Sequence, residues 1–396
     1  MRSLVKMSQD AAEDSGPRLW VGFGHITVRV HAENLGGHVV LRQVRQERDA
    51  YDLRLLTEQS VLPVAAAHLP PGSVPREVPI DVELPVGAAV FTYLGAEPYD
   101  TEGDDGPAAL VEHMRALARV PPDCLEPLRL QQEVRARELL GDGVQSESFP
   151  NLVAGQVLRV VTAAEAHCPG LMFELGLPIG DVVAKQIRRD VECCRAYARD
   201  ALLHGDLHPG NLLAGAAVLD WELALVGDPV YDLAVYLERT RPDEKAETRF
   251  VEHWARWVPE AGDGGYAARL AAYRRLDRIR SAYTDVLRTV AEVAGGGRLS
   301  APVAYRAYEL GMAELDCRPV SEHEFAKRVR TASRRRRLLL WLRDLCRRPV
   351  DEAKKIRELV DLVEGAGPAE CAAAPGPGDV ADAGHAARTG GGHVGR

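Results

Sequence analysis

The first regular pattern along the chain is an alternation of apolar and polar residues between positions 20 and 44. Residues 26–30, Ile-Thr-Val-Arg-Val, alternate strictly, as in a strand with one buried face. Residues 34–37, Asn-Leu-Gly-Gly, are typical of a turn, and a second strand-like run covers residues 38–44. The pattern predicts two antiparallel strands joined by a hairpin.

A helix and a further strand are expected next. Leu53 and Leu56 lie on one stripe of a helix that we predict over residues 47–60, with Pro63 closing it. Residues 88–94 form a short apolar run that predicts a buried strand.

The remainder of the chain divides by composition. Helical patterns dominate from about residue 100 to residue 320, and residues 321–364 form a basic helical segment. Residues 1–18 are polar, and residues 365–396 are rich in Gly, Ala and Pro. We expect a flexible tail at the first and a disordered tail at the second, because neither can bury enough apolar surface to order itself.

Composition and charge limit the class of protein. The chain has 396 residues, of which 46% are hydrophobic, so it can form two or three folding units with cores of their own. Its formal net charge of −9 argues against a general nucleic-acid binder, which must neutralise phosphates. No apolar run approaches the roughly 18 residues of a membrane span. We therefore expect a globular protein that binds neither nucleic acid nor membrane.

The start of the chain and its cysteines indicate a location. The first 16 residues lack the apolar centre of a secretory signal. The seven cysteines are odd in number and show no Cys-x-x-Cys spacing, so a disulfide framework or a zinc ribbon is not expected. A reducing cytoplasm is the predicted location.

The most informative stretch is His-Gly-Asp-Leu-His-Pro-Gly-Asn-Leu-Leu at 204–213, followed by Val-Leu-Asp-Trp-Glu at 218–222. The apolar pairs at 212–213 and 218–219 predict two short strands joined by a turn. We expect Leu213 to pair with Val218, which makes a four-residue turn of residues 214–217.

This register would gather oxygen ligands at the open end of the hairpin. Asn211 would lie opposite Asp220, and the turn at Pro209-Gly210 would bring Asp206 close to both. Carboxylate and amide oxygens are hard ligands, which suit Mg²⁺ held together with substrate phosphates.

A third stretch, Gly-Asp-Pro-Val-Tyr-Asp-Leu-Ala at 227–234, is typical of a helix start. Asp228 is placed as the N-cap, Pro229 at the first helical position and Asp232 in the first turn. Capping and the helix dipole explain both acids, so we interpret them as structural.

Together the three stretches resemble the aminoglycoside phosphotransferase and choline kinase family. They occur in the family's order within 31 residues, and the order of elements is similar over roughly residues 19–310. Each stretch alone is a weak signal, but the combination is specific.

The resemblance implies an α+β, bilobal protein-kinase-like fold. A small antiparallel-sheet lobe over residues 19–94 would bind the nucleotide, and a larger, mostly helical lobe over residues 95–320 would carry catalysis and the acceptor. The family's reaction moves the γ-phosphate of ATP or GTP to a hydroxyl of a small molecule. It implies Asp206 as the catalytic base, with Asn211 and Asp220 as Mg²⁺ ligands. Positioning and charge neutralisation carry most of such a transfer.

A kinase also needs a hairpin over the phosphates and a cation on the third strand. Gly22 and Gly24 fit the hairpin, although they fit an ordinary turn as well. No lysine occurs between Lys6 and Lys185, so the usual lysine is absent. Arg42 has its strand position and offers bidentate donors to phosphate; otherwise it is a solvent-facing arginine.

The partner of Arg42 is expected on the following helix. Asp49 lies on the same helical stripe as the leucines and would need a cation if buried there. Glu47 is the alternative partner. The strand at residues 88–94 would lead into the hinge, where Tyr93 and its neighbours would offer backbone groups to the adenine.

The spacing after Asp220 indicates the class of acceptor. Six residues separate Asp220 from Gly227, which leaves no room for the long segment with which protein kinases hold a peptide. A small-molecule hydroxyl is therefore expected, on an aminoglycoside-like antibiotic or a metabolite. The acids at 243–247 either form a solvated helix face or meet a cationic acceptor.

Two other functions remain open at this point. The absence of the lysine would suit a pseudokinase that binds nucleotide without turnover. The alternation His204-x-Asp206-x-His208 resembles the ligand pattern of metal-dependent phosphohydrolases, although the other histidines are scattered. His208 either orients the loop or takes part in catalysis directly.

Overall fold

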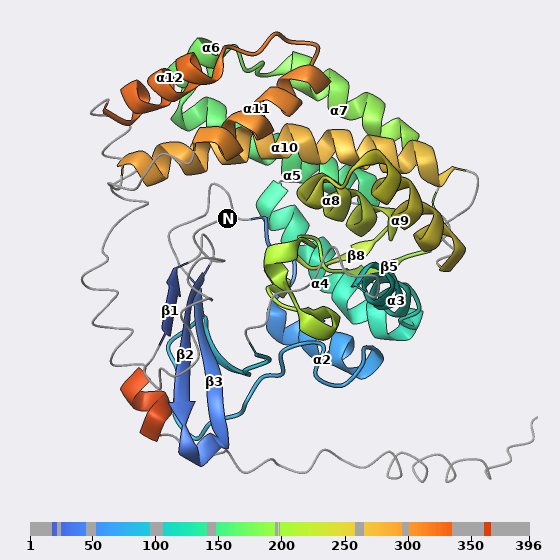
Figure 1. Ribbon diagram of the computed structural model, residues 1–396, viewed down its shortest axis with the longest axis vertical. Coiled ribbons are helices and arrows are strands. Elements are labelled where there is room, and N and C mark those ends of the chain that lie inside the picture. Colours follow the sequence, from blue (N-terminus) through green and yellow to red (C-terminus); the bar gives the residue numbers. More distant parts are fainter. Residues whose placement is uncertain are drawn as a thin grey trace, which may run out of the picture.

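The computed structural model describes most of the chain as two lobes, a β-rich lobe and a helical lobe (Figure 1). The described residues are 18–21, 25–44, 53–95, 106–140, 148–194, 197, 199–257, 265–294, 301–334 and 360–365. The predicted α+β bilobal fold is confirmed.

The small lobe is built on one antiparallel sheet with the strand order β1-β2-β3-β4. Its strands are β1 (Arg18–Val21), β2 (His25–Ala32), β3 (Gly37–Val44) and β4 (Ala88–Thr92). β2 pairs with β3 along its whole length, with Val30 opposite Val39, which confirms the predicted hairpin. β4 ends two residues before the predicted limit at residue 94.

The alternation along β2 and β3 gives the sheet two different faces. Ile26, Val28 and Val30 lie on one face and are buried in an apolar cluster with Leu41. The opposite face carries Arg42 toward the helical lobe, because side chains alternate between the faces of a strand.

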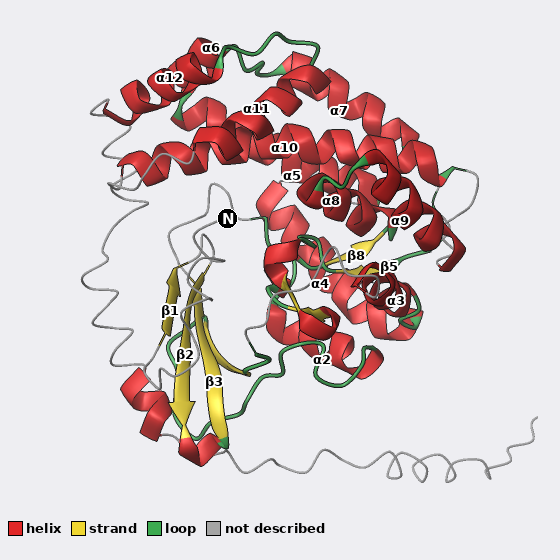
Figure 2. Cartoon of the chain, in the orientation of Figure 1, coloured by secondary structure: helices red, strands yellow, loops and turns green. Residues whose placement is uncertain are grey.

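A short helix at residues 360–365 covers the apolar face of this sheet. Val360 and Val363 are buried there against the same cluster as Val28 and Leu41. In Figures 1 and 2 the helix lies beside β1 and β2, far from the other C-terminal helices. The end of the chain thus completes the core of the small lobe, which its composition did not predict.

The helix predicted over residues 47–60 is described only in part: residues 53–57 are not helical, and residues 47–52 lie outside the described residues. Helix α2 runs over Glu58–His68, with Thr57 as its N-cap, and Pro63 lies inside it rather than ending it. Leu55 and Leu56 are buried in non-helical chain, so their apolar character reflects burial and not helical periodicity.

The larger lobe is almost entirely helical. It contains α3 (Gly106–Ala118), α4 (Pro122–Leu140), α5 (Phe149–His167), α6 (Pro169–Leu175), α7 (Asp181–Cys193), α8 (Val230–Thr240), α9 (Glu244–Trp257), α10 (Tyr266–Ala294), α11 (Ala301–Glu314) and α12 (Glu322–Arg334). α10 is the central helix and packs against α5, α7, α8, α11 and α12. No helix in the part of the chain that the structure describes has the length and hydrophobicity to cross a membrane.

Two small β-ladders hold the loops between α7 and α8. β5 (Ala201–Leu203) pairs with β8 (Leu225–Gly227), and β6 (Leu212–Leu213) pairs with β7 (Ala217–Val218). The loop from His204 to Asn211 connects these ladders, so the motif identified in the sequence lies where they meet.

Replacing Val363 by Asp should lower the free energy of unfolding of the small lobe. The helix would leave the sheet rather than bury a charge, so the expected loss is about 1.5–3 kcal/mol, the value of burying one valine. Leu362→Asp is the matched control, because Leu362 on the same helix is 36% exposed and should tolerate the charge. Denaturant unfolding of both variants tests this, and equal stability would show that the helix does not dock on the sheet.

Candidate active site

The loop that carries Asp206 is held by a close approach of two backbones. Gly205 follows β5 with φ of 78°, and a Cβ at this position would lie 1.9 Å from the carbonyl oxygen of Leu223. Only glycine fits such a conformation and contact. The loop therefore turns sharply after His204 and directs Asp206 away from β5.

A buried carboxylate fixes the start of this loop. Asp232, in the first turn of α8, accepts the backbone N–H of His204 at 2.7 Å and that of Gly205 at 2.8 Å. Burial raises the pKa of Asp232, against the effect of His204 and these two hydrogen bonds. The contacts give Asp232 the structural role expected from the sequence.

Asp228 secures the beginning of α8. It is fully buried, accepts the N–H of Val230 at 3.1 Å and forms an ion pair of 2.9 Å with the buried Arg269 of α10. Two acids of the third sequence stretch thus join α8 to the catalytic loop and to the central helix.

The buried ring of His204 links the two segments that carry the predicted site residues. Its Nε2 donates to the carbonyl oxygen of Leu219 at 2.8 Å, and its Nδ1 accepts the N–H of Asp206 at 3.3 Å. The ring of Trp221 contacts it edge-on, with 4.9 Å between centroids. Burial lowers the pKa of His204, so the ring is neutral and can make both hydrogen bonds.

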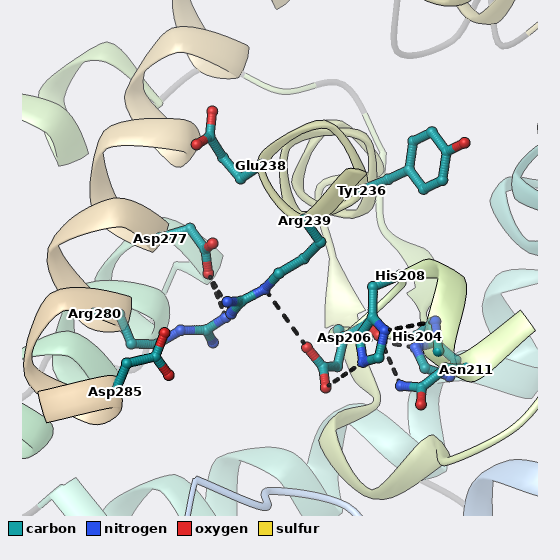
Figure 3. A network of polar contacts seen from close by, with 12 residues as sticks. His204, Asp206, His208, Asn211, Tyr236, Glu238, Arg239, Asp277, Arg280 and Asp285 are labelled. Atoms are coloured by element: carbon teal, nitrogen blue, oxygen red, sulfur yellow. Dashed lines mark hydrogen bonds and ion pairs between the residues drawn. The ribbon is translucent and has the colours of Figure 1, made fainter. Parts of the chain in front are cut away.

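Asp206 lies between an imidazole and a guanidinium (Figure 3). Its Oδ2 is 3.6 Å from Nε2 of His208, and its Oδ1 is 4.0 Å from Nε of Arg239. Burial alone would raise the pKa of Asp206, but the proton of His208 and the charges of Arg239 and Arg280 outweigh it and hold the pKa well below its ordinary value. Asp206 is ionised at neutral pH.

His208 orients the loop. Its Nδ1 accepts the N–H of Gly210 at 3.0 Å, so its Nε2 carries the proton that faces Asp206. Of the two roles left open for His208, these contacts support the orienting one.

The hairpin that follows has a register different from the predicted one. Leu212 pairs with Val218, not Leu219, because the turn contains three residues and includes Ala216 at φ of 57°. Asn211 therefore meets Leu219, whose N–H donates to its carbonyl oxygen at 2.8 Å, and Asp220 lies one residue beyond.

Asn211 is nevertheless held next to Asp206. Its Nδ2 donates to the backbone carbonyl oxygen of Asp206 at 3.0 Å. Because this hydrogen bond fixes the amide group, its Oδ1 faces away from that carbonyl and is available to a cation. The side chain is 7% exposed.

Asp220 occupies a backbone conformation that few residues adopt. Its φ of 64° lies in the left-handed region, which aspartate tolerates better than most residues. Its Oδ1 accepts from Nη2 of Arg42 at 2.6 Å. Burial would raise the pKa of Asp220, but the neighbouring Arg42 lowers it below its ordinary value.

Arg42 on the third strand therefore joins the two lobes, in addition to the phosphate contact predicted for it from the sequence, which these contacts do not test. Its Nη1 donates to Glu58 at the start of α2, and its Nη2 contacts both Asp220 and Nδ1 of His25. Burial would lower its pKa, but Glu58 and Asp220 raise the pKa of Arg42 above its ordinary value. The guanidinium stays charged.

Among the described residues, the carboxylate that Arg42 contacts on a helix is one that the sequence pattern did not single out. The prediction named Asp49, which lies outside the described residues, as does the alternative Glu47. The observed partner is Glu58, which also accepts the N–H of Trp221 at 3.0 Å. The N-cap Thr57 followed by an acid was the sequence signal for this helix start.

A histidine and a glutamate that were not predicted as ligands complete the junction. His25 begins β2, and its Nδ1 lies 2.9 Å from Oε2 of Glu222. Donor atoms of His25, Asp220 and Glu222 all lie within 4.8 Å of one another. The beginning of β2 and the segment after Asp220 therefore meet beside Arg42.

A cleft of about 640 Å³ lies on one side of the Arg42–Glu58 pair. The strand residues that line it include Gly87 and Ala89, at the beginning of β4, and its opposite wall includes Val134 of α4. Phe91 of β4, two residues before Tyr93, also lines this cleft.

Three nucleotide-binding predictions remain untested by these contacts. Gly22 and Gly24 lie outside the described residues. Tyr93 is described, and its ring contacts His38 and the guanidinium of Arg29, each with a separation of 5.8 Å. Whether its backbone meets the adenine stays a prediction.

The site can now be compared with known proteins. A model of the phosphotransferase enzyme family matches residues 16–283, more than half of the chain. The chain belongs to this family. The resemblance seen in the sequence is thereby confirmed, and the enzyme is a small-molecule kinase. No curated protein sequence matches the chain.

Solved structures support the fold. An ethanolamine kinase from Plasmodium vivax is 12% identical, with a TM-score of 0.52 over 85% of this chain and 86% of that one. A GDP complex of aminoglycoside 2'-phosphotransferase-IIIa is 14% identical, with a TM-score of 0.49 over 80% and 97%. A choline kinase from Streptococcus pneumoniae is 12% identical, with a TM-score of 0.48 over 80% and 98%. The first of these shows that this phosphotransferase has the kinase fold.

Arg42→Ala should weaken nucleotide binding by about 1.5–3 kcal/mol, the range for hydrogen bonds to charged groups. Arg42→Lys should recover part of the loss, because lysine keeps the charge but not the planar fork. Calorimetric titration with ATP and GTP measures both effects.

The coupling between Arg42 and Glu58 provides the control for this prediction. Glu58→Gln combined with Arg42→Ala should lose much less affinity than the sum of the single variants, because each removes the same contact. Fully additive losses would show that the ion pair does not prepare Arg42 for the nucleotide.

Proposed function

We propose that this phosphotransferase moves the γ-phosphate of ATP or GTP to a hydroxyl of a small molecule, with Asp206 as base and Mg²⁺ as cofactor. The supporting observation is that His204 ties the backbone of Asp206 to the segment that leads into Asp220. Asn211 is hydrogen-bonded to the same backbone, so hydrogen bonds connect the segments that carry Asp206, Asn211 and Asp220.

Asp206 would orient the acceptor hydroxyl and take up its proton. It is ionised and 27% exposed in its side chain, so it can accept a hydrogen bond from a substrate. Its low pKa makes it a weak base, and the proton would move late, when bond formation to phosphorus has made the hydroxyl acidic.

The donor set fits Mg²⁺. Asn211 and Asp220 would hold the ion through an amide and a carboxylate oxygen, which are ligands that this hard cation prefers. The fully buried His204 cannot join them, because both of its ring nitrogens are already hydrogen-bonded. Once bound, Mg²⁺ would neutralise charge on the transferred phosphate.

Arg42 would serve the nucleotide from the other lobe. Glu58 holds its Nη1, while its Nη2 now donates to Asp220. We assign this second amino group to a phosphate oxygen of the nucleotide, since a guanidinium binds phosphate well and Glu58 keeps it in place. An arginine thus takes the part that a lysine has in the family pattern.

The phosphohydrolase alternative is disfavoured by the same geometry. It requires both histidines of the His204-x-Asp206-x-His208 pattern to be free for metal. Both ring nitrogens of His204 are committed, to the Leu219 carbonyl oxygen and to the Asp206 backbone N–H, so His204 cannot bind a metal.

Asp206→Asn should lower the transfer rate by about 10²–10⁴ while nucleotide affinity stays nearly unchanged, because it removes the proton acceptor and no phosphate contact. ADP or GDP formation in a panel of hydroxylated antibiotics and metabolites measures the rate. Asp181→Asn, at an exposed acid in the first turn of α7, is the control and should remain fully active. A rate within about tenfold of the parent enzyme would exclude Asp206 as the base.

Asp220→Ala should abolish the dependence of nucleotide affinity on Mg²⁺. Without its carboxylate the ion loses a ligand, so the titration with and without Mg²⁺ should give similar dissociation constants. An unchanged Mg²⁺ dependence would mean that the metal is held elsewhere.

A further inference from the structure

The side of Asp206 that faces α8 and α10 carries an incompletely satisfied guanidinium. Nη2 of Arg239 donates to Asp277 over a long 3.4 Å, and its Nε is 4.0 Å from Asp206. Within the described residues, this buried Nε–H makes no hydrogen bond. A buried donor without an acceptor is costly, so the position favours an anion.

The neighbouring Arg280 shares the carboxylate of Asp277 with Arg239 and lies closer to it. Arg280 is buried and donates to the same carboxylate oxygen of Asp277 at 2.5 Å, and to Tyr231 at 3.0 Å. One carboxylate thus serves two guanidinium groups. Arg280 has short, direct partners, whereas Arg239 keeps donors that a ligand can use.

Further positive charge surrounds this pair. Arg241 follows α8 directly. Burial lowers the pKa of Arg241, and the nearby positive charges of Arg306 and Arg239 lower it further, although Glu238 raises it. The acid on the same side is Asp285, 3.7 Å from Arg288.

One acid of the run considered for a cationic acceptor, Glu247, is already paired. Glu238 forms ion pairs with Arg274 and Arg278 at 2.5 and 2.7 Å, and Glu247 is bound by Arg274. The acidic run at 243–247 therefore does not leave Glu247 free for an ammonium group.

The position of Arg239 separates the acceptor from the nucleotide. Figure 3 shows Arg239 and Asn211 on opposite sides of Asp206, with Asp277, Arg280 and the rest of α10 beyond Arg239. The metal and the nucleotide phosphates belong on the Asn211 side in the proposed function. An anion that reaches Arg239 would then come from the acceptor.

We propose that the acceptor carries an anionic group, a carboxylate or a phosphate, near its reactive hydroxyl, and that Arg239 binds this group. The inference rests on the proposed function. Arg239 would place the hydroxyl against Asp206 by holding the neighbouring charge, and it would disfavour acceptors with an ammonium group at the same place.

The test compares hydroxyl compounds that differ in one charged group. D-Glycerate and glycerol 3-phosphate are the anionic probes, glycerol is the neutral one and serinol the cationic one; gluconate, glucose 6-phosphate, glucose and glucosamine form a larger matched set. Nucleoside diphosphate release and the rise in melting temperature are measured with each probe. In at least one set, an anionic probe should exceed its neutral counterpart about tenfold in kcat/KM or apparent affinity, the lower range for a charge-assisted hydrogen bond. The carboxylate and phosphate arms show which anion is preferred.

Variants of Arg239 assign this preference to a residue. In Arg239→Gln the anionic and neutral probes should give similar values of kcat/KM, mainly because KM for the anionic probe rises. Arg239→Lys should restore part of the preference for the anionic probe. A role limited to supporting Asp206 would change kcat for all probes alike and leave the ratio intact. Arg330→Gln, at an exposed arginine of α12, is the matched control and should keep the ratio.

The outcomes separate this inference from the function on which it rests. If the parent enzyme does not bind nucleotide together with Mg²⁺, the proposed function is refuted. If nucleotide binds and neutral or cationic probes match or exceed the anionic ones, or no anionic probe is turned over or stabilises the protein, the anionic acceptor is refuted. A charge preference that persists in Arg239→Gln refutes the role of Arg239.

Discussion

The active site depends on a carboxylate that is buried without contacting substrate. Asp232 accepts two backbone N–H groups of the catalytic loop, and the neutral ring of His204 then ties this loop to the segment before Asp220. Satisfying these buried groups is obligatory, because each would be costly without a partner. The position of Asp206 follows, since its own backbone N–H is bound by the same histidine.

A second constraint connects the lobes. Arg42 comes from the sheet, Glu58 from α2 and Asp220 from the larger lobe, and the one guanidinium pairs with both carboxylates in a largely buried junction. Removing Arg42 would leave the two carboxylates without their cation. The junction therefore keeps Arg42 close to Asp220, the residues that we propose for binding phosphate and Mg²⁺ respectively. The helix at residues 360–365 supports the same sheet from its opposite face.

The charges around Asp206 determine its protonation state. The low pKa of Asp206 comes from His208 on one side and from Arg239 and Arg280 on the other. The same arginines that keep the carboxylate ionised also give the acceptor side its positive character. One arrangement thus serves orientation of the hydroxyl and, in our proposal, selection of an anionic acceptor.

The order of three motifs pointed to the fold class. Short-range patterns in the sequence were sufficient for the β2–β3 hairpin and for a helix start close to Asp228, where α8 begins at Val230 with Pro229 as its N-cap. Such features depend on neighbours in the chain, so alternation, turn residues and caps reveal them. The tertiary structure alone decided which distant charges meet: Glu58 and Asp220 at Arg42, and Arg239 beside Asp206. The sequence pattern marked Arg42 by its strand position, but it gave neither Glu58 nor Arg239 as a site residue. Their roles arise because packing of separate elements excludes water and leaves each charge to find a partner there.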